Sequence, residues 1–148
     1  MRTGLLLVGL LVAGACTVRS NDGDIDVDPI TDRIGEWEST LTARNDSGVR
    51  GAAAVYAAGV GSQVSISIAG STPNAHHPWH VHRGTCATGG AIVGDRDAYP
   101  PLHVGSDGAA SGTATISVGL DENTEYHVNV HKSATEMGTA IACGNLTS

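Results

Sequence analysis

The sequence predicts an all-β domain in which short antiparallel strands form a sandwich or barrel. Glycine is abundant, with 20 residues, whereas the aromatic residues are two Trp, three Tyr and no Phe. Several runs alternate between apolar and polar residues, which is the period of a half-buried strand. Turn-forming residues separate these runs, and the sequence has no convincing amphipathic helix pattern. Together these observations favour many short strands over helices.

The clearest strand prediction covers residues 63–68, where Val64, Ile66 and Ile68 share one face and polar residues share the other. The strand pattern begins at about residue 36. The same alternation, or a similar composition, predicts further strands at 52–58, 113–118, 126–131 and 141–146. Turn signals lie between them at 45–48, 59–61, 106–108 and 121–123.

The first 15 residues have the pattern of an export signal. Arg2 precedes an apolar run, residues 5–12, that is too short to cross a bilayer. The run leads to Ala13-Gly14-Ala15-Cys16, which resembles the lipobox of bacterial lipoproteins and implies a lipid on Cys16. The alternative is an ordinary secretory peptide cleaved near Ala15, with Cys16 left as a spare thiol. Both alternatives predict export, and the lipobox implies a membrane-anchored lipoprotein of the bacterial cell envelope.

The next segment, residues 16–36, reads as an acidic linker that offers few apolar side chains for burial. The aspartates between residues 22 and 28 also permit a calcium-loop interpretation, but the late glutamate and the flanking helix of an EF-hand are missing. The predicted organisation is therefore a signal peptide (1–15), a lipid-anchored linker (16–36) and a β domain (37–148).

The net charge limits the classes of partner that the chain could bind, and the cysteine count indicates one disulfide. The net charge is −7 and the chain has no basic cluster, so nucleic acid is disfavoured as a partner and membrane contact is expected only through the lipid. If Cys16 is lipidated, Cys86 and Cys143 remain as one pair in an oxidising compartment. A disulfide between them would stabilise the domain by about 4 kcal/mol in the chain-entropy model.

Five of the seven histidines lie between His76 and His103. In His80-Val81-His82, the two imidazoles are two residues apart, so on a strand they point to the same side. They form half of a metal site, and His131, on the polar face of another predicted strand, could supply a third imidazole. Imidazole suits both copper and zinc, so the donor type does not select the metal. The alternative is that these are surface histidines of an ordinary sandwich.

A family resemblance becomes specific at these residues. Residues 77–82, His-Pro-Trp-His-Val-His, resemble the His-Gly-Phe-His-Val-His segment of the Cu/Zn superoxide dismutases. Further matches keep the family's order between about Thr40 and Ser148. They are Cys86, Pro100-Pro101-Leu102 with Asp107-Gly108, Val128-Asn129-Val130-His131 and Ala142-Cys143-Gly144.

This resemblance implies a Greek-key β-sandwich or barrel. It also implies that His80, His82 and His131 are copper ligands. His77 matches a family histidine that we interpret as structural, hydrogen-bonded and partly buried. We expect His76 and His127 to face solvent.

The sequence departs from the family where the zinc site should be. Between Cys86 and Leu102 there is no histidine. Asp95 and Asp97 lie in this segment, but two carboxylates alone make a poor zinc site. We therefore expect copper without the zinc site.

The bridging histidine is also missing from its expected place. His103 is the only nearby substitute: it could complete a four-histidine copper site, or it could point outward beside the core residue Leu102. Ala140 stands where the family has an anion-binding arginine. The other basic residues that could attract a small anion are Arg83, Arg96 and Lys132.

Three hypotheses follow. The first is an exported copper protein of the superoxide dismutase type that dismutates superoxide, although efficient activity does not follow from the sequence. The second is a non-enzymatic copper binder for storage, delivery or scavenging in the cell envelope. The third is a disulfide-closed interaction module without a metal. The oligomeric state stays open.

Overall fold

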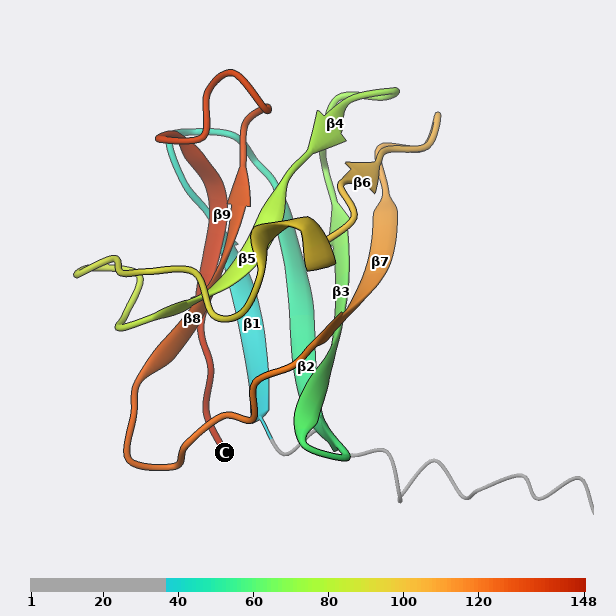
Figure 1. Cartoon of the computed structure of the whole chain (residues 1–148). Helices are drawn as coiled ribbons and strands as arrows, with labels where there is room; N and C mark the ends of the chain where they lie inside the picture. Colours follow the sequence, from blue (N-terminus) through green and yellow to red (C-terminus); the bar gives the residue numbers. More distant parts are fainter. Residues whose placement is uncertain (1–36) are drawn as a thin grey trace, which may run out of the picture.

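The computed structural model describes residues 37–148, which form an all-β domain (Figure 1). The predicted signal peptide, the predicted lipidation site Cys16 and the predicted linker lie outside these residues. The strands are β1 (Trp37–Ala43), β2 (Arg50–Ala58), β3 (Gly61–Ala69), β4 (His76–His77), β5 (Trp79–Arg83), β6 (Leu102–His103), β7 (Ala110–Ile116), β8 (Tyr126–His131) and β9 (Ala140–Asn145). A 3-10 turn, η2 (Arg96–Ala98), lies between β5 and β6. Within the described range, no helix is long and apolar enough to span a membrane.

Seven of the strands form one antiparallel sheet in the order β5-β8-β9-β1-β2-β3-β7, and the sheet curls into a half-barrel (Figure 1). The other two, β4 and β6, form a small separate pair. The last strand, β9, lies beside the first, β1, which is the return typical of a Greek key. The prediction of an all-β sandwich or barrel is confirmed.

The alternating runs form strands close to the predicted bounds. The run at 126–131 coincides with β8, and the run at 63–68 lies within β3. In β3, Val64, Ile66 and Ile68 are buried as expected. The short strands β4 and β6 carry no alternation that a sequence pattern could detect, because each has only two residues.

The core lies on the inner face of the curled sheet. Trp79 and Val81 of β5 are fully buried in it, and Trp79 donates from Nε1 to the carbonyl oxygen of Pro100 at 2.8 Å. Tyr99 packs edge-on against the Trp79 ring, with 5.2 Å between ring centroids. Since side chains alternate along a strand, the burial of Trp79 and Val81 in the core turns His80 and His82 to the outer face.

A long segment, residues 84–101, covers that outer face. Its backbone follows the free edge of β5: the Arg83 N–H donates to the Ala91 carbonyl and the Val93 N–H donates to the Val81 carbonyl, both at 2.9 Å. The expected disulfide between Cys86 and Cys143 is present, with 6.0 Å between the Cα atoms, and it ties this segment to β9. The outer face of β5 is therefore closed from water, unlike an ordinary sheet surface.

Candidate metal centre

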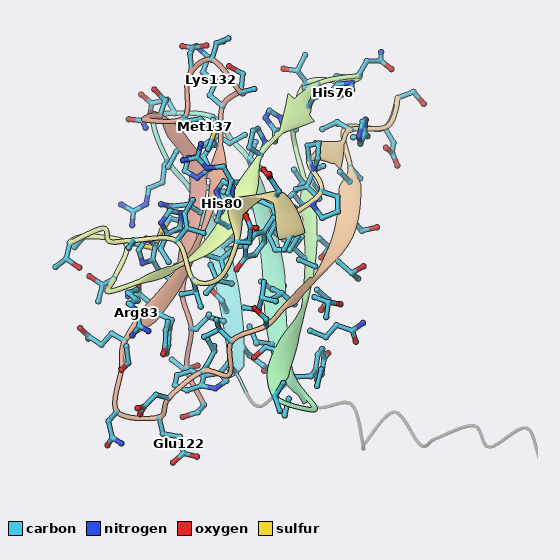
Figure 2. The ribbon with its side chains drawn as sticks, in the orientation of Figure 1. His76, His80, Arg83, Glu122, Lys132 and Met137 are labelled. Atoms are coloured by element: carbon cyan, nitrogen blue, oxygen red, sulfur yellow. A yellow bond between two sulfur atoms is a disulfide. The ribbon has the colours of Figure 1, made fainter. Side chains whose placement is uncertain are left out.

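Three histidines converge beneath the covering segment. One ligand nitrogen from each of His80, His82 and His131 can be chosen so that all three lie within 4.8 Å of one another. The ring centroids are 5.2 to 5.7 Å apart. The three side chains are only 2%, 8% and 6% exposed, and Figure 2 shows His80 near the middle of the domain. This group could hold a metal ion.

Strand pairing explains why residues so distant in the sequence meet. β5 and β8 are antiparallel neighbours, with His80 opposite Asn129 and His82 opposite His127. The His131 N–H donates to the Pro78 carbonyl at 2.8 Å, which continues the pairing beyond the last ladder residue. Side chains opposite each other in such a pair lie on one face, so His131 projects to the same side as His80 and His82.

An irregularity lies beside His131. Val130 pairs with Ala142 and His131 pairs with Ala140, so the register between β8 and β9 shifts by one residue and Ile141 has no partner. Such bulges bend a strand and re-aim side chains next to functional sites. The His-x-His pattern gives no signal for this bulge.

The free ring nitrogens of these histidines are the strongest indication of a ligand. Nδ1 of His80 and Nε2 of His82 are buried without a hydrogen-bond partner, and neither buried ring nitrogen of His131 makes a well-formed hydrogen bond, although the Met137 backbone lies close enough to act on its pKa. A buried polar atom without a partner typically costs about 1–3 kcal/mol. A metal ion would satisfy one such atom on each ring, so the donor set fits an ion.

The backbone sets the tautomer of His82. Its Nδ1 lies 2.9 Å from the carbonyl oxygen of Gly90, an acceptor, so Nδ1 carries the proton and Nε2 keeps its lone pair for the cluster. Metal-binding histidines commonly have such a carbonyl partner. A side chain at Gly90 would overlap the carbonyl oxygen of Arg83, so glycine is needed for this close approach.

The other two buried histidines are fully bonded instead. In His77, Nε2 lies 2.7 Å from the Ser71 hydroxyl, and Nδ1 lies 3.1 and 2.9 Å from the carbonyls of His131 and Lys132. His77 therefore holds the backbone that carries His131, in line with the structural role given to it above. It has no free nitrogen for a metal.

The solvent-facing position expected for His127 is wrong. His127 is 0% exposed and its ring stacks on that of His82 at 5.2 Å. Its Nδ1 lies 3.0 Å from the Gly84 carbonyl, and the Asn129 amide lies 3.4 Å from Nε2. The expectation failed because alternation assigns one face of β8 to solvent, whereas the 84–101 segment covers that face.

The structure does not bring His103 into the group. His103 is exposed on β6, where it pairs with His76 of β4. Of the two carboxylates considered for zinc, Asp95 accepts a hydrogen bond from the Asp97 N–H at 3.0 Å and caps η2.

Burial keeps the three clustered imidazoles neutral. Burial, followed by the neighbouring His131 and His82 and by the Arg96 charge, lowers the pKa of His80 to about 3. Burial also lowers the pKa of His82 and of His131. Metal ligation requires the neutral imidazole, so at neutral pH no proton has to be displaced from these rings.

Two residues of the covering segment complete the surroundings. Tyr99 packs its ring edge against His80, with 5.3 Å between centroids, and donates its hydroxyl to the Val93 carbonyl at 2.7 Å. Burial raises the pKa of Tyr99 to about 12, so its side chain is uncharged at neutral pH and packs beside the cluster without adding charge. The charge of Arg96, on η2, lowers the pKa of both His80 and His131, which makes it a cation acting on the cluster. The sequence did not single out Tyr99, since an isolated tyrosine in a loop carries no signal.

No family model matches this chain, and no curated protein matches its sequence significantly. The fold and the site therefore define the molecule by themselves. It is an all-β domain with a disulfide-tethered covering segment and a buried three-histidine group able to hold a metal ion.

Proposed function

We propose that this chain is an exported copper protein of the superoxide dismutase type, with His80, His82 and His131 as the copper ligands. The observation that carries the proposal is the convergence of three buried, neutral imidazoles whose free nitrogens have no other partner. Leaving such atoms unpaired would be unfavourable in a domain without an ion.

Copper is favoured over zinc on two grounds. Among divalent first-row ions, copper binds nitrogen sites most tightly in the Irving–Williams order. The resemblance of residues 77–82 and 128–131 to the copper strands of the Cu/Zn superoxide dismutases points to the same ion. A site of three histidines also suits zinc, so metal identity is the first quantity to measure.

Bound copper would supply one-electron redox chemistry by cycling between two oxidation states. The chain's own residues would do the rest. The imidazoles of His80, His82 and His131 would hold the ion, and as only three protein donors they would leave room for a small anion to bind it. Arg96 adds positive charge beside His80 and His131, and a cation near a buried site attracts anions such as superoxide. Tyr99 and the covering segment limit the access of larger molecules.

A second candidate is a non-enzymatic copper binder for storage, delivery or scavenging. It is favoured by the absence of any histidine between Cys86 and Leu102 and by Ala140 at the position of the family's arginine. A dismutase without the bridging imidazole should deliver protons less efficiently. Both candidates share the same ligands and differ only in turnover.

The decisive experiment loads the purified domain with copper and measures bound copper and superoxide removal. The wild type is expected to bind one buried copper per chain, and the double variant His80→Ala with His82→Ala is expected to lose it along with any dismutation. The matched control is His76→Gln with His103→Gln, which removes two imidazoles outside the buried group and should leave dismutation unchanged.

The outcomes separate the candidates. Copper bound at the buried group without dismutation above the double variant would favour the storage or delivery role. Failure of the wild type to bind copper at the buried group would overturn both. Export is tested separately, because mass spectrometry of the mature N-terminus should find lipid on Cys16, and an unmodified Cys16 in the processed protein would contradict the lipoprotein proposal.

A further inference from the structure

A second pair of histidines faces solvent on the small sheet formed by β4 and β6. His76 of β4 and His103 of β6 are direct cross-strand partners. Their ring centroids are 4.3 Å apart, closer than any two rings of the buried group. In Figure 2, His76 is labelled at the upper edge of the domain, away from His80.

The backbone pattern defines how close these side chains are held. The Val104 N–H donates to the Ala75 carbonyl at 2.9 Å, one pair beyond His76 and His103. Hydrogen-bonded and non-hydrogen-bonded pairs alternate along an antiparallel ladder, so His76 and His103 form a non-hydrogen-bonded pair. In such pairs the side chains lie at their closest, with Cβ atoms about 4.5–5.5 Å apart.

The next pair fixes the direction of both imidazoles. His77 and Leu102 are buried, and successive residues of a strand point to opposite faces. His76 and His103 therefore both point outward on one side. Neither ring makes a hydrogen bond to another residue of the described range, 37–148, so the ring nitrogens are open to a ligand from solvent.

We propose that His76 and His103 form a second, exposed metal site that chelates a divalent transition-metal ion between the two strands. Imidazole pairs suit copper, nickel and zinc, and Cu(II) is bound most tightly in the Irving–Williams order. Water completes the coordination, since no other histidine, cysteine or carboxylate of residues 37–148 joins this pair in a three-residue group. The net charge of −7 favours the approach of a cation.

The site gains its affinity from holding two donors at once. Once one imidazole has bound the ion, the second is held close by at high effective concentration, which can raise affinity about 10²-fold or more over one donor. The ion also joins β4 to β6 and binds only the folded arrangement, so it should raise the melting temperature. This site does not depend on the copper proposal for the buried group.

The test uses Cu(II) alone as the probe, titrated by calorimetry into the His80→Ala, His82→Ala double variant. This protein is expected to retain one Cu(II) per chain. Adding either His76→Gln or His103→Gln should weaken that binding about 10²-fold. Unchanged affinity in either single variant would mean that one imidazole, or another surface group, binds the ion, and would overturn the site.

A measurement on the unmodified domain covers the case in which the double variant does not fold. Paramagnetic Cu(II), added in small excess over the one equivalent that the buried group is proposed to bind, should broaden the imidazole NMR signals of His76 and His103 together. Each signal should be protected when the other histidine is changed to glutamine. Broadening of only one ring, or broadening that persists after the partner is changed, would overturn the pairing. Loss of the buried copper alone bears on the proposed function and leaves this site intact.

Discussion

The two halves of the curled sheet bury their strands in different ways. The hairpin half consists of β1, β2, β3 and β7. In β1 and β3, buried and exposed side chains alternate strictly enough that one face belongs to the core and the other meets solvent. The histidine half consists of β5, β8 and β9. Here four of the five residues of β5 are buried in succession, and β8 is buried on both faces. The difference arises because the 84–101 segment covers β5 and β8, whereas nothing comparable in residues 37–148 covers the outer face of the hairpins.

This difference determines where polar side chains become buried. A half-covered strand can leave polar side chains in water, but a strand covered on both faces has to bury them. The outward residues of β5 and β8 are histidines and an asparagine, and burying polar groups is costly unless they find partners. His127 finds partners in Gly84 and Asn129, while the three clustered histidines keep free nitrogens. The candidate metal centre thus lies in the half of the sheet where polar side chains are buried despite the free-energy cost.

The largest expected effect on stability comes from removing the disulfide that ties the covering segment, residues 84–101, to β9. Changing both Cys86 and Cys143 to serine should lower the free energy of unfolding by about 4 kcal/mol, because the bond closes a long loop in the unfolded chain. Urea unfolding of the oxidised wild type and of the double variant measures this. The Cys86 N–H would still have its hydrogen bond to the Asn145 side chain, so local docking should weaken rather than vanish.

Hydrogen exchange on the same variant sharpens the comparison. The amides of Arg83 and Val93, which join the cover to β5, should lose more protection than those between β2 and β3. Equal loss of protection in both halves would show that the 84–101 segment and the hairpins open as one unit, and that the two halves of the sheet do not differ in local stability.

The second effect concerns pH in the metal-free domain. The pKa of His80 falls from 6.5 in the unfolded chain to about 3 in the fold, and burial lowers the pKa of His82 and His131 as well. Between these values the unfolded chain takes up protons that the folded domain does not. Stability should therefore fall as the pH drops below 6.5, by up to about 1.4 kcal/mol per pH unit for each such histidine.

Denaturant midpoints at pH 7, 6 and 5, with a chelator present, measure this slope above the range in which carboxylates titrate. The variant His80→Gln removes one contributing group and should show a shallower slope. A slope equal to that of the wild type would mean that His80 is not kept neutral by the fold. Stability that does not change between pH 7 and 5 would contradict the whole set of lowered pKa values.

The two halves also differ in how far the sequence predicts them. In the hairpin half, β3 and β7 follow from a local period of two and the turns follow from turn residues, whereas β2 is an alanine-rich run without apolar–polar alternation. Near the centre, the spacing of His80 and His82 predicts a shared face, and the paired cysteines predict the tether. The positions of Gly90, Tyr99 and Arg96 depend on how a loop folds over the sheet, and the bulge at Ile141 depends on register between distant strands. No local pattern encodes these, which is why His127 was assigned to solvent.

The smallest effect tests what the cover contributes to chemistry rather than to stability. Arg96 is exposed on η2, yet its charge acts on His80 and His131. If the domain dismutates superoxide, Arg96→Ala should lower the second-order rate constant by up to about tenfold at low ionic strength, because steering by one cation is screened by salt. Copper content and the free energy of unfolding should stay unchanged. The measurement is the rate constant as a function of ionic strength.

Lys132→Ala is the matched control, since it removes a cation next in sequence to His131 of the buried group. The Lys132 ammonium is already paired with the Glu136 carboxylate at 2.9 Å, and the exposed pair should contribute no more than about 1 kcal/mol to stability. The backbone of Lys132 holds His77 and Thr139 and is unaffected by the change. The rate should therefore respond less to Lys132→Ala than to Arg96→Ala. A larger effect of Lys132→Ala would indicate that the loop after β8, rather than the covering segment, steers the anion. Equal rates in the wild type and both variants would show that neither cation steers it.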